Sequence, residues 1–182
     1  MGPIMHPHVA GVFKQLEDAR AKLHAAVDTV PMNLRSRRPG DGRWSVDEIL
    51  EHLSLVEQRF AALIAMRIAE AREVGLGAEG ESRDPFPQAL RRMFDDRANR
   101  RTAPDAVHPK GGLDHAAAWA AVERSRALMR DTVAGADGLA LSRVVHTHPV
   151  FGTLNVYQLV ELVANHEVRH SKQIAGIAEQ FV

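Results

Sequence analysis

The chain has 182 residues, of which 45% are hydrophobic and 25% are charged, and this is the composition of an ordinary globular protein. It contains no cysteine, which excludes disulfides, thiolate metal sites and a cysteine nucleophile. Lysine plus arginine and aspartate plus glutamate both number 23, so the basic excess typical of a nucleic-acid-binding protein is missing.

Targeting signals are also missing from the sequence. The first residues do not combine a positively charged start with an apolar run, and no stretch approaches the roughly 18 apolar residues of a membrane span. We therefore expect a cytoplasmic protein with neither membrane nor nucleic acid as a partner. The length suits a single domain over residues 1–182.

Apolar residues recur at spacings of three and four in four long segments, a pattern that predicts helices. The first predicted helix runs from about His8 to Val30. The second follows Ser45, which is expected to form a capping box with Glu48, and continues to about Val74.

The rest of the chain continues this helical pattern. The segment Glu79–Gly112 contains four prolines and predicts one short helix around Gln88–Arg100. The third long helix is predicted over Asp114–Ala134, and the fourth from an N-cap at Thr153 to about Gln180. Strand signals are sparse. The sequence therefore predicts an all-α protein, a four-helix bundle.

Three histidines interrupt the apolar stripes of two predicted helices. His166 and His170 are four residues apart in the fourth helix, so their rings project side by side from one face. His52 lies on the apolar stripe of the second helix. A single such histidine is usually a core residue bonded to a backbone carbonyl. Three together need more polar partners than aliphatic neighbours supply, and one divalent metal ion would satisfy all of them.

The segment His166–His170 also matches the H-E-x-x-H pattern of zinc proteases, in which the glutamate is the general base. The extended metzincin pattern would need glycine and histidine where this chain has Gln173 and Gly176. A glutamate ligand on a later helix is excluded, since Glu179 is the only acidic residue after His170. A protease is therefore disfavoured, and we expect Glu167 to be solvated or to support the site indirectly.

Two groups of residues resemble motifs of the DinB-like superfamily, the family of DNA-damage-inducible-protein-like helical bundles. The first group precedes and begins the second helix: Trp44-Ser45-Val46, Glu48, Glu51-His52-Leu53 and Glu57. The second group belongs to the fourth helix: His148-Pro149, Phe151-Gly152, Leu159, His166-Glu167, Arg169-His170 and Gln173-Ile174.

This resemblance implies a mononuclear metal site made by His52, His166 and His170, with zinc or nickel as the expected ion. Relatives in the family include S-transferases that use a low-molecular-weight thiol, and an isomerase that also depends on a thiol. The resemblance thus suggests a metal-dependent thiol S-transferase, with a thiol as cosubstrate and a small molecule as the second substrate.

Such a three-histidine site would leave room at the metal for a ligand, where the ion would favour deprotonation of a thiol or of water. A metal-dependent hydrolase is therefore one alternative. A second is a non-catalytic bundle that binds metal or a small molecule in a stress response. A third is a structural module with buried histidines and no metal.

Other residues have weaker functional interpretations. His146 and His148 are read as turn residues, with a fourth ligand or an acid–base group as the alternative. Glu51 and Glu57 are read as solvated or orienting groups, and Tyr157 as a packing residue. The arginines of Arg83–Arg101 are read as a solvated face, or as a cradle for an anionic thiol. Apolar residues left over on the helices suggest a homodimer.

Overall fold

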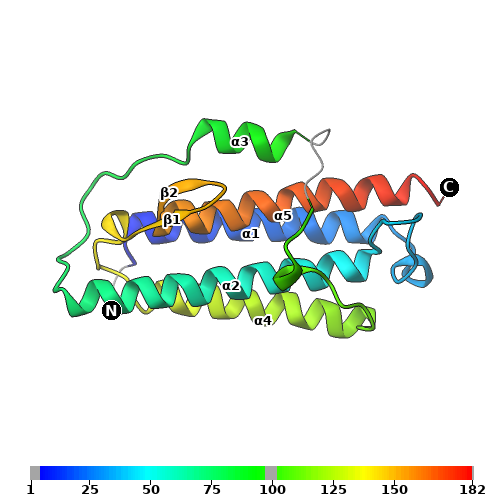
Figure 1. Ribbon diagram of the computed structural model, residues 1–182, viewed down its shortest axis with the longest axis horizontal. Helices are drawn as coiled ribbons and strands as arrows, with labels where there is room; N and C mark the ends of the chain where they lie inside the picture. The colour runs from blue at the N-terminus through cyan, green and yellow to red at the C-terminus, as the bar shows by residue number, and fades with distance from the viewer. Residues whose placement is uncertain (1–4, 97–101, 182) are drawn as a thin grey trace.

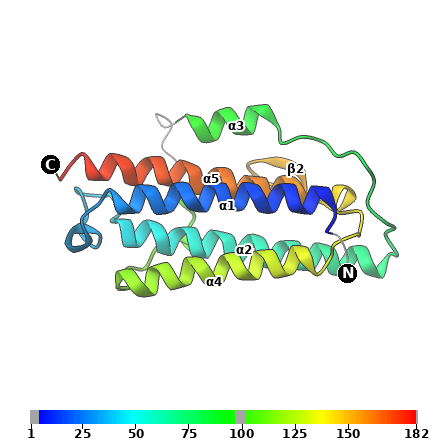
Figure 2. The same ribbon diagram turned by 180° about the vertical axis from the view of Figure 1, so that it is seen from behind.

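The computed structural model describes residues 5–96 and 102–181. Four long helices form a bundle: α1 (Pro7–Asp28), α2 (Val46–Glu73), α4 (His115–Ala134) and α5 (Val156–Ala178). Helices α1 and α5 run in one direction, and α2 and α4 run side by side in the other (Figures 1 and 2). Helix α1 packs on α5, α4 packs on α2, and α2 and α5 also contact each other. The predicted all-α four-helix bundle is confirmed.

Side-chain caps fix where the helices begin. The Ser45 hydroxyl accepts from the backbone N–H of Glu48, and the Glu48 carboxylate accepts from the N–H of Ser45, so the predicted capping box is confirmed. Asp114 caps α4 by accepting from Ala117, again as the sequence predicts. These caps fix the residues at which α2 and α4 begin.

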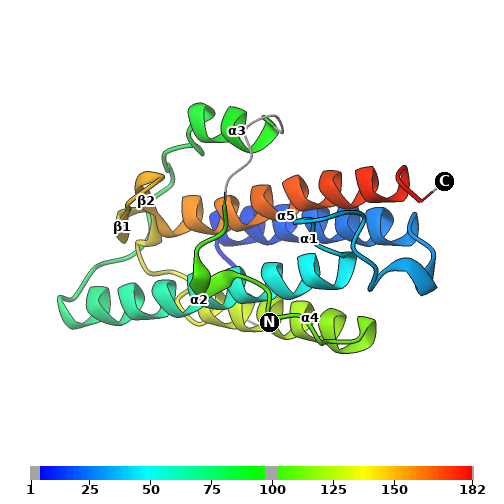
Figure 3. The same cartoon turned by 45° about the vertical axis from the view of Figure 1, so that its right-hand side comes forward.

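The connection between α2 and α4 must return along the whole bundle, because both helices run in the same direction. It carries the short helix α3 (Gln88–Asp95), which lies outside the bundle beside α5, and the 3-10 turn η2 (Asp105–Val107) (Figures 1 and 3). Helix α3 begins where the sequence predicts and ends earlier; residues 97–100 of the predicted helix lie outside the described residues. This returning segment places loop residues against the face between α2 and α5.

A small hairpin precedes α5, contrary to the sequence prediction. Strand β1 (Val145–His148) pairs antiparallel with β2 (Gly152–Asn155), and Gly152 adopts a positive φ of 74° at the turn. Thr153 is therefore a strand residue, and α5 is capped by Asn155, which forms a second capping box with Gln158. The prediction of Thr153 as the N-cap was wrong because a better cap lies two residues later.

The apolar core is divided into two clusters. One contains the fully buried Leu16, Ile64, Met129 and Leu159, one from each long helix, and the other contains Leu23, Ile49, Val122 and Ile174. Among the described residues, no helix is both long and apolar enough to cross a membrane.

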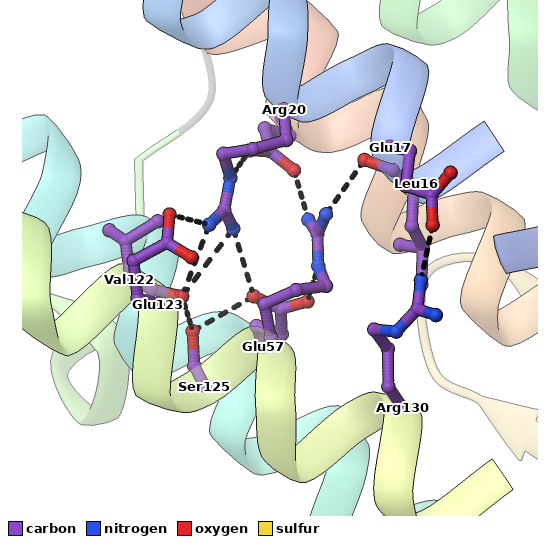
Figure 4. A network of polar contacts seen from close by, with 10 residues as sticks. Leu16, Glu17, Arg20, Glu57, Val122, Glu123, Ser125 and Arg130 are labelled. Carbon is purple, nitrogen blue, oxygen red and sulfur yellow. Dashed lines mark hydrogen bonds and ion pairs between the residues drawn. The ribbon is translucent and has the colours of Figure 1, made fainter. Parts of the chain in front are cut away.

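Charged residues from all four long helices lie between these clusters: Arg20 on α1, Glu57 on α2, Arg126 on α4 and Glu167 on α5. Arg126 pairs with Glu57 at 2.6 Å and also with Glu167, and Arg20 pairs with Glu167 at 2.6 Å. Ser125 donates to Glu57, and Glu123 pairs with Arg20 (Figure 4). Each buried charge thus has an opposite charge within hydrogen-bonding distance, as burial requires.

Candidate metal centre

The three predicted histidines meet on the face between α2 and α5. His52 lies in the second turn of α2, and His166 and His170 follow one another on successive turns of α5. One ring nitrogen of each residue lies within 4.8 Å of the other two, and they form the one cluster with metal-binding potential among residues 5–96 and 102–181. The structure therefore brings together all three residues, and their binding of a metal stays a prediction.

The nitrogens that converge are the Nε2 atoms. The Nε2 of His166 lies 3.3 Å from that of His52 and 3.1 Å from that of His170. His52 and His170 are buried, and His166 is partly buried.

The opposite nitrogens of two of the rings are already bonded. His52 Nδ1 lies 2.7 Å from the carbonyl oxygen of Val107, and His170 Nδ1 lies 2.9 Å from Oε1 of Gln173. Both oxygens can only accept, so both Nδ1 atoms carry the proton, and both Nε2 atoms present lone pairs. Ligating histidines in metal sites are typically oriented in this way.

No arrangement of protons on the three neutral rings gives every Nε2 atom a hydrogen-bond partner. If His166 is protonated at Nε2, it can donate to one neighbour and not to both. If it is protonated at Nδ1, three lone pairs face one another. A cation accepting all three lone pairs removes this conflict, and imidazole nitrogens are a usual donor set for zinc and nickel. The residues present therefore fit a divalent metal ion.

The surroundings keep these rings neutral. Burial lowers the pKa of His166 well below its usual value, and the charges of His170, His52 and Arg169 lower it further. Burial, together with His52 and Arg169, lowers the pKa of His170 to about 3, against the opposing effect of Gln173. The pKa of His52 is also lowered, chiefly by burial. Neutral imidazole is the form that binds a metal, so the ligands are available at neutral pH.

A cavity of about 1070 Å³ opens onto the three histidines. Its walls are largely apolar and aromatic, and include Trp44, Val56, Phe60, Phe94, Phe151 and Leu162. The Trp44 ring lies 4.8 Å from the ring of His52 and holds that imidazole from the side. The cavity is large enough for a small organic molecule.

The two histidines of the hairpin lie in different places. His148 lines the cavity, where its ring stacks on Phe60 and Phe151 at centroid distances of 6.1 and 4.5 Å. His146 contacts Arg67 and does not line the cavity. Both are strand residues, so the interpretation as turn residues was wrong. His148 does not belong to the cluster of converging nitrogens.

The glutamates near the histidines have structural partners. Glu167 is only 3% exposed and pairs with Arg20 and Arg126, so the expectation of a solvated side chain was wrong. Glu57 is buried in the same ion network, and burial raises its pKa despite the nearby Arg126. Glu51 is also buried and accepts from the backbone N–H groups of Lys110 and Gly111.

The arginine-rich segment is not one functional unit. Arg83 pairs with the buried Glu161 at 2.9 Å and lies over the fully buried ring of Tyr157, away from the cavity. Arg91 lies over Phe86, and Arg97, Arg100 and Arg101 fall outside the described residues. The packing role of Tyr157 is confirmed, whereas Arg83 is neither solvated nor part of a cradle beside the histidines.

Sequence reasoning missed the groups that orient the histidines. The Val107 carbonyl comes from a loop distant in sequence, and nothing in the sequence indicates which carbonyl would reach His52. Gln173 could have been found, because it is three residues after His170 and therefore on the same helix face. Trp44 was assigned to a hydrophobic staple with Ile49 and to the family motif, and its contact with His52 was not predicted.

Comparisons with known proteins identify the family of the chain. The family model described as the DinB superfamily matches residues 15–174. The chain is 25% identical over 152 residues to the uncharacterized protein YuaE of Bacillus subtilis (strain 168), a match that covers 80% of this chain and 84% of that protein. No solved structure gives a significant match. Because the family model spans most of the chain and its helical bundle is the fold observed, the protein belongs to the DinB superfamily.

Proposed function

We propose that the protein binds one divalent metal ion, zinc or nickel, through His52, His166 and His170, and acts as a metal-dependent thiol S-transferase. The observation that carries the proposal is the convergence of three Nε2 atoms at the wall of a cavity large enough for a small molecule. A closed structural zinc site normally has four protein ligands, whereas the described residues offer three here.

The residues of the chain would divide the work between ligation and substrate binding. Val107 and Gln173 hold the protons of two imidazoles on Nδ1 and keep the Nε2 lone pairs directed at one point. The apolar walls limit the access of water to a bound substrate. A divalent ion bound by the histidines would supply the positive charge that lowers the pKa of an entering thiol, so that a thiolate nucleophile is available at neutral pH.

Elemental analysis of protein purified without a polyhistidine tag tests the metal site. We expect about one equivalent of zinc or nickel per chain and its loss in His166→Ala. His146→Ala is the matched control, because it removes a histidine that lies outside the cavity. Wild-type protein that stays metal-free after incubation with both metals would overturn the proposal.

The transferase step is tested by thiol consumption. Metal-loaded protein is incubated with a panel of low-molecular-weight thiols and an electrophile such as monochlorobimane, and conjugates are quantified against the His166→Ala variant. We expect conjugation that depends on the metal. Metal binding without conjugation of any thiol would reject the transferase and favour a non-catalytic binding protein, whereas metal-dependent ester cleavage would favour a hydrolase.

A further inference from the structure

The charges that line the cavity are all of one sign. Arg43, Arg59 and Arg169 contribute to its wall, and no aspartate or glutamate does so among the described residues. Elsewhere in the molecule, guanidinium groups that approach the core are paired with carboxylates, as Arg20, Arg83 and Arg126 are. Arg43 and Arg59 differ from these arginines, because neither contacts a carboxylate within the described part of the chain.

Arg59 is placed to meet a ligand. It makes no hydrogen bond or ion pair to any residue in the described part of the chain, and its side chain is exposed. It follows His52 by seven residues and Val56 by three on α2, so the three side chains share one helix face. Seven residues of helix correspond to about 10 Å along the axis, so Arg59 lies two turns from the metal centre.

His148 adds a hydrogen-bond donor at the same end of the cavity. Its Nδ1 accepts from the backbone N–H of Val150 at 3.1 Å, so the proton of the neutral ring is on Nε2. Its ring stacks on Phe60, the residue after Arg59, and on Phe151. The contacts with Phe60 and Phe151 therefore place this ring N–H donor at the end of the cavity where α2 carries Arg59.

Between this end and the histidines the wall is apolar. Val56 on α2, Leu162 on α5 and Phe94 from α3 lie in this part of the cavity lining. The Phe94 ring contacts His166 at a centroid distance of 6.4 Å and Phe151 at 5.8 Å, so one aromatic side chain connects the metal centre with the hairpin.

We propose that the substrate of this cavity is a small organic anion, with a carboxylate bound by Arg59 and His148, an apolar body along Val56, Phe94 and Leu162, and its reacting end at the three histidines. The arrangement of the wall supports this assignment, since Val56, Phe94 and Leu162 lie between Arg59 and the three histidines.

The location of the reacting end rests on the proposed function, whereas the anion end can be tested without metal. We would measure binding of 4-phenylbutanoate, its neutral amide and 4-phenylbutylamine to chelator-treated protein by isothermal titration calorimetry. We expect the carboxylate to bind at least about 10-fold more tightly than the amide, and the amine most weakly, because the cation would meet like charges. The preference should decrease with added salt.

Variants assign the preference to this end of the cavity. Arg59→Gln should remove most of the preference for the carboxylate, and His148→Phe, which keeps an aromatic ring between Phe60 and Phe151, should reduce it by a smaller factor. Arg124→Gln is the matched control, because it removes an exposed arginine that does not line the cavity. Equal binding of carboxylate and amide, tighter binding of the amine, or no binding of any probe would each overturn the proposal.

The two proposals can fail separately. If the protein never takes up metal but still prefers the carboxylate through Arg59, the anion site is supported and the transferase is rejected. If the protein binds zinc or nickel but does not distinguish the three probes, the metal centre is supported and the anion site is rejected.

Discussion

Glu51 accepts a hydrogen bond from the backbone N–H of Gly111 at 3.0 Å, and so ties the loop before α4 to the helix that carries His52. The neighbouring N–H of Lys110 donates to the other carboxylate oxygen at 3.1 Å. Gly111 has a φ of 73°, a conformation that suits glycine. This loop begins just after Val107, whose carbonyl accepts from His52. By holding the loop, Glu51 therefore helps to keep the Val107 carbonyl in place against His52, the next residue in the sequence.

Loss of Glu51 should therefore weaken metal binding without removing a ligand. We expect Glu51→Ala to reduce zinc affinity about 10-fold, within the range typical of groups that orient ligands. Competition with a chromogenic chelator measures this affinity. Glu51→Gln retains one acceptor oxygen and should have a smaller effect, and Glu73→Ala, an exposed glutamate of the same helix, should have none. Unchanged affinity in Glu51→Ala would show that the loop holds Val107 in place by itself.

Local signals in the sequence were sufficient to predict most of the fold. The capping box of Ser45 and Glu48 and the spacing of His166 and His170 depend on neighbouring residues in one helix, so they could be read directly. The hairpin was missed because each strand has only four residues, and β2 contains a single β-branched residue, Thr153. The pattern Asn155-x-x-Gln158, a capping box, is a signal that could have corrected the start of α5.

Long-range contacts explain the remaining differences between the sequence predictions and the structure. Glu57 and Glu167 resemble surface residues when their helices are read separately, because a charge on a helix normally faces water. They are buried only because Arg20 and Arg126 approach from two other helices at the same level of the bundle. The candidate ligands could be predicted from residue type and spacing, whereas the carbonyl of Val107 could not, since it is a backbone group in a loop.

The buried ion network predicts a large cost for removing one member. Arg126→Met would remove one of the two arginines that pair with both Glu57 and Glu167 and leave Arg20 alone between two buried carboxylates, so we expect a loss of about 3–5 kcal/mol in the free energy of unfolding. Urea denaturation followed by circular dichroism measures it. Arg124→Met is the control, because this exposed arginine lies two residues away on the same helix. Equal denaturation midpoints for the two variants would contradict a stabilising role for the paired charges.

The corrected start of α5 can be tested with two alanine substitutions. Asn155→Ala removes the side chain that accepts from the N–H of Gln158 at 2.9 Å, and we expect a loss of about 1 kcal/mol. Thr153→Ala removes an exposed methyl group and a hydroxyl that contacts Thr147 on the hairpin, so we expect a change of less than about 0.5 kcal/mol. The reverse order of the two effects in thermal or urea denaturation would restore Thr153 as the cap.

The depressed pKa of His170 predicts how stability depends on pH in metal-free protein. The folded pKa is about 3, whereas an unfolded histidine titrates near its ordinary value of about 6.5. Between these values the unfolded chain binds a proton that the folded chain does not. The contribution of His170 to stability is therefore present above about pH 6.5, and it is lost as the pH falls through the folded pKa.

Chelator-treated protein should consequently become less stable between pH 7 and pH 5, with His170 alone accounting for about 2 kcal/mol at pH 5. Urea denaturation at pH 7, 6 and 5 gives the slope. His170→Asn lacks this titration and should show a shallower slope, whereas His146→Asn should keep the wild-type slope because His146 lies outside the cavity. If His170→Asn keeps the wild-type slope as well, the ring at position 170 is hydrated in the metal-free protein, and its burial against His52 and His166 requires the metal.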